Sequence, residues 1–257
     1  MGKTDHQKSL SMLLINQLPY INLDSQLPLD TIPKNLIEAI SESYDFIKKN
    51  TWQKTTLLNG DVSNCNWHIK ESGAKCTSDY FGIEVKNQTV APMWILDLTI
   101  DNNKNDTNLY DSLINSPDEW RNIKFRSDLP KSWDPFITWL QNLDCFDHVG
   151  RSSLLITRPG IAPQYHRDIG ISDCDYKPTP HRQEFIWLKV TDTKNLYILD
   201  KKRTPIKVES KSAFFNHHNW HGSHKPLPYW SFSFKIEGVF KQKFRSQLKI
   251  DLNDGYD

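Results

Sequence analysis

The chain has 257 residues, and its 32 basic and 31 acidic side chains leave a formal net charge of +1. This near balance argues against a broad basic field for nucleic acid, so no nucleic-acid partner is expected. With 37% hydrophobic and 12% aromatic residues the composition is not that of a disordered chain, and we expect a single domain over residues 1–257.

The start of the chain and its cysteines predict a cytoplasmic protein. The only apolar run near the N-terminus, residues 12–15, is too short for a signal-peptide core or a membrane span. None of the four cysteines forms a C-x-x-C pair, and their scatter is typical of reduced thiols. We therefore expect no membrane partner.

Residues 1–144 mix helical and strand patterns. Residues 33–50 predict a helix, and 132–143 predict a second one with Pro135 in its first turn, where proline is tolerated. Residues 94–100 form an apolar run typical of a short strand. In the first helix five apolar residues are expected to share one face: Leu36, Ile37, Ile40, Tyr44 and Ile47.

From residue 145 onward the pattern changes to short strands separated by turns. The expected strands are 151–157, 184–190, 196–199, 206–208, 212–215 and 229–239. This regular spacing is typical of a sandwich or barrel. We predict a mainly β fold with flanking helices, with a double-stranded β-helix (the jelly roll of cupins) as its core over 145–240. Residues 241–257 are polar and basic and predict a surface extension.

The main candidate for chemistry is His166-Arg167-Asp168, followed later in the chain by His221. In extended backbone the side chains repeat every two residues, so His166 and Asp168 would point to the same side. Two imidazoles and one carboxylate suit non-haem Fe(II) and leave positions open on the metal. The pattern predicts that these three residues are metal ligands and catalytic residues. In the alternative interpretation, the H-x-D spacing is chance and the histidines are ordinary surface or core residues.

Two segments around these residues resemble a known family. Residues 154–168, L-L-I-T-R-P-G-I-A-P-Q-Y-H-R-D, resemble the first metal-ligand segment of the aspartyl/asparaginyl β-hydroxylase-like Fe(II)/2-oxoglutarate dioxygenases, and residues 213–238 resemble the second. The resemblance implies a jelly-roll fold, Fe(II), and 2-oxoglutarate and molecular oxygen as co-substrates. It implies hydroxylation of an unactivated C–H bond in an amino-acid side chain of a peptide or protein, or in a small molecule.

One position departs from the family's pattern. The family carries an arginine in an R-x-S motif about ten residues after the second histidine, where it pairs with the far carboxylate of 2-oxoglutarate. Here the motif corresponds to S-F-S, with Ser231 in place of the arginine and Ser233 kept. A buried carboxylate needs a cation. The candidates, in order, are Arg182, Lys235 and Lys189, and for each the alternative is a solvated surface charge.

Four further residues are expected near the substrate: Arg158, Tyr165, Trp220 and His224. The alternative for each is a core, turn or loop position. The missing arginine also motivates a second function, a cupin-like metal enzyme that does not use 2-oxoglutarate. A third is a jelly-roll binding module without catalysis.

Overall fold

The computed structural model describes residues 19–50, 52–54, 74–78, 84–90, 93–101, 123–160, 184–200, 204–215, 221–223 and 226–248. In this part of the chain the fold is mainly β, and all of the strand pairs are antiparallel. This agrees with the predicted β-rich class with flanking helices.

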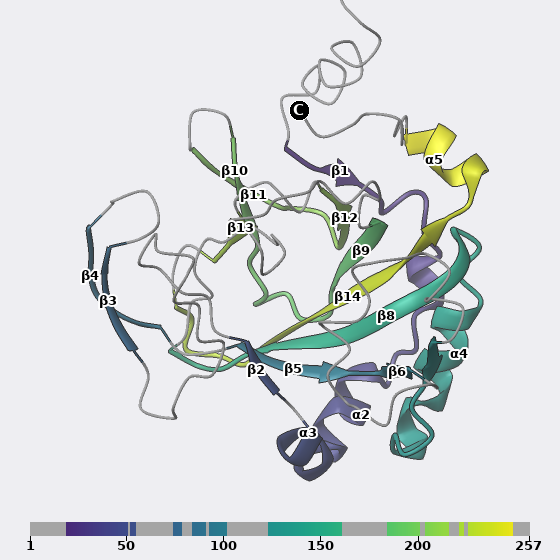
Figure 1. Ribbon diagram of the computed structural model, residues 1–257, viewed down its shortest axis with the longest axis horizontal. Helices are drawn as coiled ribbons and strands as arrows, with labels where there is room; N and C mark the ends of the chain where they lie inside the picture. The colour runs from purple at the N-terminus through teal and green to yellow at the C-terminus, as the bar shows by residue number, and fades with distance from the viewer. Residues whose placement is uncertain are drawn as a thin grey trace, which may run out of the picture.

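A seven-stranded sheet forms the centre of the molecule (Figure 1). Its two longest strands, β8 and β14, pair from Thr157 opposite Ser231 to Phe146 opposite Phe240. In spatial order the strands are β1 (Ile21–Asn22), β12 (Ser212–Phe214), β9 (Glu184–Lys189), β14 (Ser231–Phe240), β8 (Phe146–Thr157), β5 (Met93–Asp97) and β2 (Trp52–Lys54).

A three-stranded sheet lies on one side of this large sheet. Its order is β11 (Pro205–Lys207), β10 (Tyr197–Leu199) and β13 (His221–Gly222). From β9 to β14 the chain passes back and forth between these two sheets. Two hairpin-like pairs stand apart: β3 (Ala74–Ser78) with β4 (Glu84–Val90), and β6 (Thr99–Asp101) with β7 (Ile123–Phe125).

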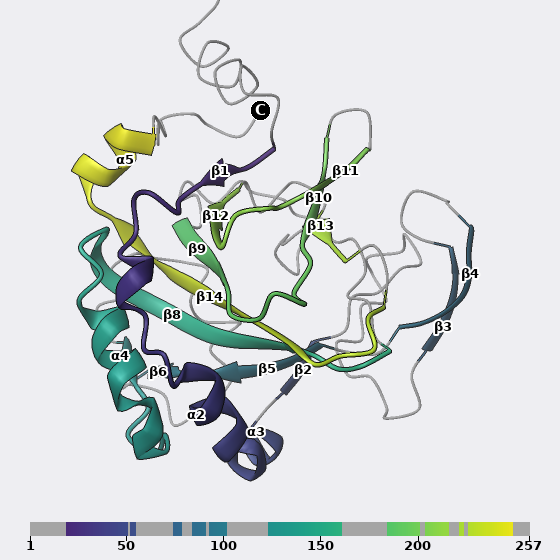
Figure 2. The ribbon, with the colours of Figure 1, turned by 180° about the vertical axis from the view of Figure 1, so that it is seen from behind.

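The helices lie on the other side of the large sheet, as Figures 1 and 2 both show. They are η1 (Leu29–Thr31), α2 (Leu36–Glu42), α3 (Tyr44–Asn50), η5 (Lys131–Trp133) and α4 (Asp134–Gln141), while α5 (Gln242–Leu248) follows β14. Among the described residues, no helix has the length and apolar character needed to cross a membrane.

The helix predicted over 33–50 is divided at Ser43 into α2 and α3. The Ser43 hydroxyl is buried and accepts a hydrogen bond from the Trp133 indole N–H at 2.8 Å. The prediction that Ile37 and Tyr44 lie on the apolar face was wrong, since they are 49% and 47% exposed. Each directly follows a buried residue, Leu36 or Ser43. Because one residue turns a helix by about 100°, the side chains of Ile37 and Tyr44 point away from the core.

The helices pack on the outer face of the large sheet through an aromatic contact. The ring centroids of Phe136 in α4 and Phe234 in β14 are 4.3 Å apart, and Trp133 meets Phe234 edge-on at 6.4 Å. Leu154 and Ile156 of β8 belong to the same buried cluster. Elements from 1–144 and from 145–240 thus share one core, while the division of the chain at residue 144 stays a prediction.

The segment after residue 240 was expected to be a polar surface extension, but its described part forms helix α5. Phe244 and Leu248 of this helix are buried. The Arg245 guanidinium donates to both carboxylate oxygens of Glu184 in β9, at 2.7 and 2.9 Å. Glu184 also accepts the backbone N–H of Phe240 at 2.7 Å. A buried carboxylate therefore fixes α5 to the end of the large sheet.

We expect Glu184→Ala to lower the free energy of unfolding by about 3 kcal/mol, because it leaves a partly buried guanidinium and a buried N–H without their acceptor. Urea unfolding would measure this. The control is Glu209→Ala, which removes an exposed ion pair with Lys207 and should cost less than about 1 kcal/mol. Equal effects of the two substitutions would contradict the role assigned to Glu184.

A glycine is required where β14 bulges against β8. A Cβ atom on Gly238 would lie 2.5 Å from Phe146 Cδ1 and 2.7 Å from the carbonyl oxygen of His148. The register between the two strands shifts at this point. Because one of these neighbours is a backbone oxygen, a side-chain rotation alone cannot remove the clash, and the strands would have to move apart.

Gly238→Ala should therefore destabilise the protein by about 1–3 kcal/mol, the usual range for overpacking. The exposed Gln247→Ala substitution in α5 should stay within about 0.5 kcal/mol of the parent. Thermal or urea unfolding of both variants checks the difference, and an undisturbed Gly238→Ala protein would refute the close approach of the strands.

Candidate functional site

The inner face of the large sheet, turned toward the small sheet, carries a row of polar side chains. On β8 and β14 these residues alternate with the apolar residues of the outer core, because side chains in a strand point to opposite faces. With the exception of the partly buried Lys235, each of them is buried. We call this set the polar face: Asp97, Arg151, Ser153, Thr157, Ser231, Ser233, Lys235 and Glu237.

Over β9 and β12 the inner face is apolar except for the partly buried Lys189, which lies opposite Ser233. Phe185 and Trp187 of β9 pack with Ile198 of the small sheet and with Phe215 in a second buried cluster. The inner face is therefore mainly apolar over β9 and β12 and mainly polar over β8 and β14. Small-molecule sites combine apolar walls with a few polar groups in this way.

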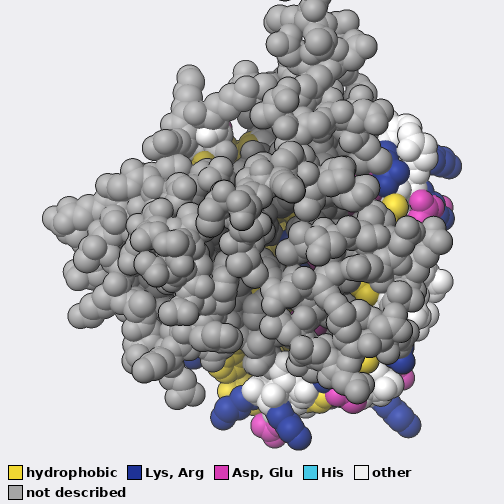
Figure 3. Space-filling model, in the orientation of Figure 1, with side chains coloured by type: hydrophobic (Ala, Val, Ile, Leu, Met, Phe, Trp, Pro, Cys, Tyr) yellow, Lys and Arg dark blue, Asp and Glu magenta, His cyan; other side chains and the backbone are white. Residues whose placement is uncertain are grey.

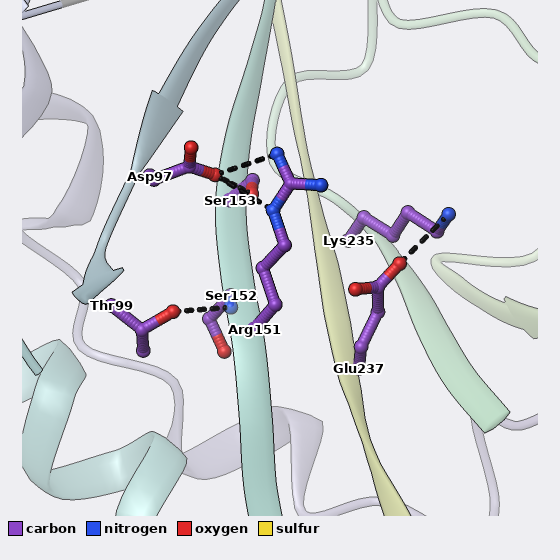
Figure 4. A network of polar contacts seen from close by, with 7 residues as sticks. All are labelled: Asp97, Thr99, Arg151, Ser152, Ser153, Lys235 and Glu237. Carbon is purple, nitrogen blue, oxygen red and sulfur yellow. Dashed lines mark hydrogen bonds and ion pairs between the residues drawn. The ribbon is translucent and has the colours of Figure 1, made fainter. Parts of the chain in front are cut away.

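Two ion pairs balance the charges at the centre of the polar face (Figure 4). Arg151 donates through Nε and Nη2 to Asp97 Oδ1, both at 3.0 Å, and the Ser153 hydroxyl donates to the same oxygen. Lys235 Nζ lies 2.9 Å from Glu237 Oε1. Buried charges persist when they are paired, and these four charged side chains meet that condition.

His221 lies on β13 of the small sheet. It is 7% exposed, and its backbone pairs with Ile198 of β10. Its ring lies 5.0 Å from the ring of Phe215, which in turn contacts Phe185 edge-on at 4.9 Å. Lys235 Nζ lies 4.9 Å from the centroid of Phe185. Two aromatic rings thus connect the predicted metal ligand to the polar face of the opposite sheet.

Several predicted site residues lie outside the described residues: His166, Asp168, Arg182, Tyr165, Trp220 and His224. Their roles stay predictions. Within the described ranges no group of three or more His, Cys, Asp or Glu residues could hold a metal ion, and two of the three predicted ligands are not in those ranges.

Arg158 lies on the helix side of the sheet edge, away from the polar face. Its guanidinium carbon is 5.0 Å from the ring centroid of Trp94, and Trp94 packs against Trp230 at 5.9 Å. Trp230 and Tyr229 are 37% and 60% exposed, so they belong to the surface next to β14. Charged side chains gather at the lower edge of Figure 3, where Figure 1 draws α3.

The structure adds a buried lysine amine that the sequence did not indicate. Lys194, in the turn after β9, is 6% exposed, and its Nζ donates to Thr157 Oγ1 at 2.8 Å. In the described part of the chain this hydroxyl is its only hydrogen-bond partner, and no carboxylate pairs with it. Desolvation by burial lowers the pKa of the Lys194 amine from 10.5 to about 7.

The sequence around Lys194, D-T-K-N at 192–195, is typical of an exposed polar turn. Hydrogen bonds to β14 fold this turn inward. Thr191 Oγ1 accepts the backbone N–H of Phe232 at 3.0 Å, and Thr193 Oγ1 donates to the carbonyl of Trp230 at 3.2 Å. These contacts depend on residues far apart in the chain, so no local pattern could have identified Lys194.

Lys194 reaches the end of the polar face where the family's arginine was expected. Its partner Thr157 pairs directly with Ser231, and facing residues in a pair have Cβ atoms about 5 Å apart. Ser233 is fully buried, and its hydroxyl has no hydrogen-bond partner within the described residues. We call Lys194, Thr157, Ser231 and Ser233 the lysine cluster. A buried amine that can be protonated, beside an unsatisfied hydroxyl, suits a carboxylate ligand.

No family model matches the chain, and no curated protein matches it. Solved structures that it resembles include a 2OG-Fe(II) oxygenase family protein and prolyl hydroxylases. A prolyl-4-hydroxylase from Pseudomonas putida shares 9% identity over 91% of this chain and 97% of that one, with a TM-score of 0.45.

Two further solved structures have lower TM-scores. A prolyl hydroxylase from Trichoplax adhaerens, in complex with a hypoxia-inducible-factor peptide, shares 11% identity at a TM-score of 0.36, over 96% of this chain and 97% of that one. An oxidoreductase of the 2OG-Fe(II) oxygenase family from Burkholderia pseudomallei shares 8% identity at 0.35, over 56% and 67%.

The buried amine predicts a pH-dependent stability. Lys194 is harder to protonate in the folded state than in the unfolded state, so the unfolded chain binds more protons between about pH 7 and 10. The free energy of unfolding should therefore rise with pH over this range, by up to about 1.4 kcal/mol per pH unit from this group, and the penalty is fully present below pH 7.

Urea unfolding of the parent and of Lys194→Met at several pH values measures this contribution. The stability advantage of Lys194→Met should be greatest below about pH 7 and shrink as the pH rises. A difference that does not change with pH would show that the amine is not buried as described.

Proposed function

We propose that the protein is an Fe(II)/2-oxoglutarate-dependent dioxygenase that hydroxylates an unactivated C–H bond. The observation that carries this proposal is the lysine cluster, with a buried amine that has no anionic partner among the described residues. It lies on the polar face, and His221 of the H-x-D…H pattern is buried in the opposing sheet. The proposed dicarboxylate site and the proposed metal ligand would thus lie in one fold.

We propose that the two sheets form the halves of a double-stranded β-helix over 145–240, with the elements of 1–144 packed outside. The order of strands supports this. β9, β12 and β14 belong to the large sheet, while β10, β11 and β13 belong to the small one. Exchange of successive strands between two antiparallel sheets is the connectivity of a jelly roll.

His166, Asp168 and His221 would hold the metal, because two imidazoles and one carboxylate suit Fe(II). The observation that fits this role is the burial of His221 between the sheets, where a neutral imidazole can be oriented by its packing against Phe215. The bound metal would activate oxygen, so that one oxygen atom enters the substrate C–H bond while 2-oxoglutarate is converted to succinate and carbon dioxide.

Lys194 is our candidate for the cation that replaces the missing arginine. Lys235 is paired with Glu237, so its charge is already balanced. Lys189 ends β9 opposite Ser233 and is only partly buried. Thr157 and Ser233 would supply hydroxyl donors to the same carboxylate. If Lys194 has this role, the missing arginine no longer favours a 2-oxoglutarate-independent enzyme, which was motivated by that absence.

The remaining details of the activity are carried by the resemblance alone. The segments 154–168 and 213–238 resemble aspartyl/asparaginyl β-hydroxylase-like enzymes. We therefore propose that the substrate is an amino-acid side chain in a peptide or protein, or a small molecule. Enclosure between the two sheets would exclude water from the reacting centre, which is the protein's contribution beside ligand binding.

The test is anaerobic binding of Fe(II) and then 2-oxoglutarate, followed by exposure to oxygen and measurement of succinate. His221→Ala should lose the metal. Lys194→Met should keep the metal and weaken 2-oxoglutarate binding by about a hundredfold or more, because a buried charge-assisted bond is lost. The matched control is Lys243→Met, an exposed lysine of α5, which should bind like the parent. No 2-oxoglutarate binding and no succinate from the parent protein would overturn the proposal.

A further inference from the structure

We propose that 2-oxoglutarate takes up one proton when it binds at the lysine cluster, so that its affinity falls as the pH rises above neutrality. This inference rests on the proposed function, because it needs a carboxylate ligand beside Lys194. The proton moves from the buffer to the Lys194 amine, which becomes an ammonium and pairs with the carboxylate. The new N–H bond replaces the bond between the proton and the buffer acid, and no other covalent bond forms or breaks.

The geometry of the ligand-free site favours a neutral amine. An ammonium carries three N–H donors, and in the described part of the chain Lys194 Nζ meets one acceptor, the neutral hydroxyl of Thr157 at 2.8 Å. The side chain is buried, and a buried ammonium without an anion is costly enough that the group gives up its proton instead. Burial lowers the pKa of Lys194 accordingly, to about 7.

The charged and titratable groups on the surrounding elements do not supply this anion. Within the described residues none of them forms an ion pair with Lys194. Glu237 is paired with Lys235, and Asp97 is paired with Arg151. The other groups are the exposed Asp192 of the same turn, Lys189 of β9, Arg158 after Thr157, Tyr197 of β10, Tyr229 before β14 and His221 of β13.

A carboxylate at this position reverses the preference of the amine. Its negative charge favours the ammonium and raises the pKa of Lys194 above its ligand-free value. Between the two pKa values the complex holds one proton more than the free protein, so binding takes up a proton there. Below about pH 7 the amine is already protonated, and binding no longer changes its proton count.

The experiment is anaerobic calorimetric titration of the Fe(II)-loaded full chain with 2-oxoglutarate, in buffers that differ in ionisation enthalpy. The uptake should be small near pH 6 and approach about one proton near pH 8.5, where the Kd should weaken by about tenfold per pH unit. As a ligand control, 2-oxobutyrate lacks the far carboxylate and should bind the metal without proton uptake.

Two variants separate the amine from its surroundings. Lys194→Arg keeps a permanent charge, so it should bind 2-oxoglutarate without proton uptake and with a pH-independent Kd. Ser233→Ala should bind more weakly but keep the uptake. If the arginine does not fit, the comparison of the two ligands on the parent protein still decides the question.

The outcomes distinguish this inference from the proposed function. Binding of 2-oxoglutarate without proton uptake near pH 8.5 would overturn the inference and leave the oxygenase proposal intact. Borohydride reduction that fixes 2-oxoglutarate to Lys194 would also overturn it, because the neutral amine would then act as a nucleophile. Failure of 2-oxoglutarate to bind at any pH would contradict the proposed function itself.

Discussion

The structure depends on the pairing of β8 with β14, a strand pair that is covered on both faces. Helices α2 to α4 cover the outer face and the small sheet lies over the inner one. Polar residues at every second position of such strands would face solvent in a one-sided sheet. Here they are enclosed, and each enclosed polar atom needs a partner or carries a cost.

Most of the enclosed charges find a partner within the protein itself. Arg151 and Asp97 neutralise one another at the centre of the polar face, and Lys235 and Glu237 do so beside them. Such pairs add little net stability, since desolvation offsets their attraction. Their value lies in keeping a polar interior at defined positions. Lys194 differs from them, because its partner in the described residues is a hydroxyl and not a carboxylate.

The paired charges and Lys194 make the centre of the polar face different from its end. At the centre of the polar face each charged side chain is paired with an opposite charge. The end near Thr157 and Ser231 instead has a buried amine and the unsatisfied hydroxyl of Ser233. An anionic ligand would gain most at this end. His221 lies on the small sheet. Its ring packs against Phe215, which in turn contacts Phe185 of the large sheet. In the proposed function, the anion and the metal would therefore be bound by different elements.

The sequence alone determined the elements whose signals are local. Period-two and apolar runs located β8, β9, β10, β12 and β14, and helical spacing located α2 to α4 to within a few residues. It also singled out His221, because the H-x-D…H pattern is a spacing of residue types. The short β1 was missed, since it exists through pairing with β12 and through Asp24, which accepts the N–H and hydroxyl of Ser212.

Only the tertiary structure decided which polar residues are inside. A lysine in a D-T-K-N turn has no local feature that marks it as buried. Its environment follows from Thr191 and Thr193, which bind the turn to a strand some forty residues later. In the same way the serine at 231 showed where an arginine was missing, but not where another cation would come from. Burial and charge pairing depend on contacts between distant segments, and spacing along the chain does not encode them.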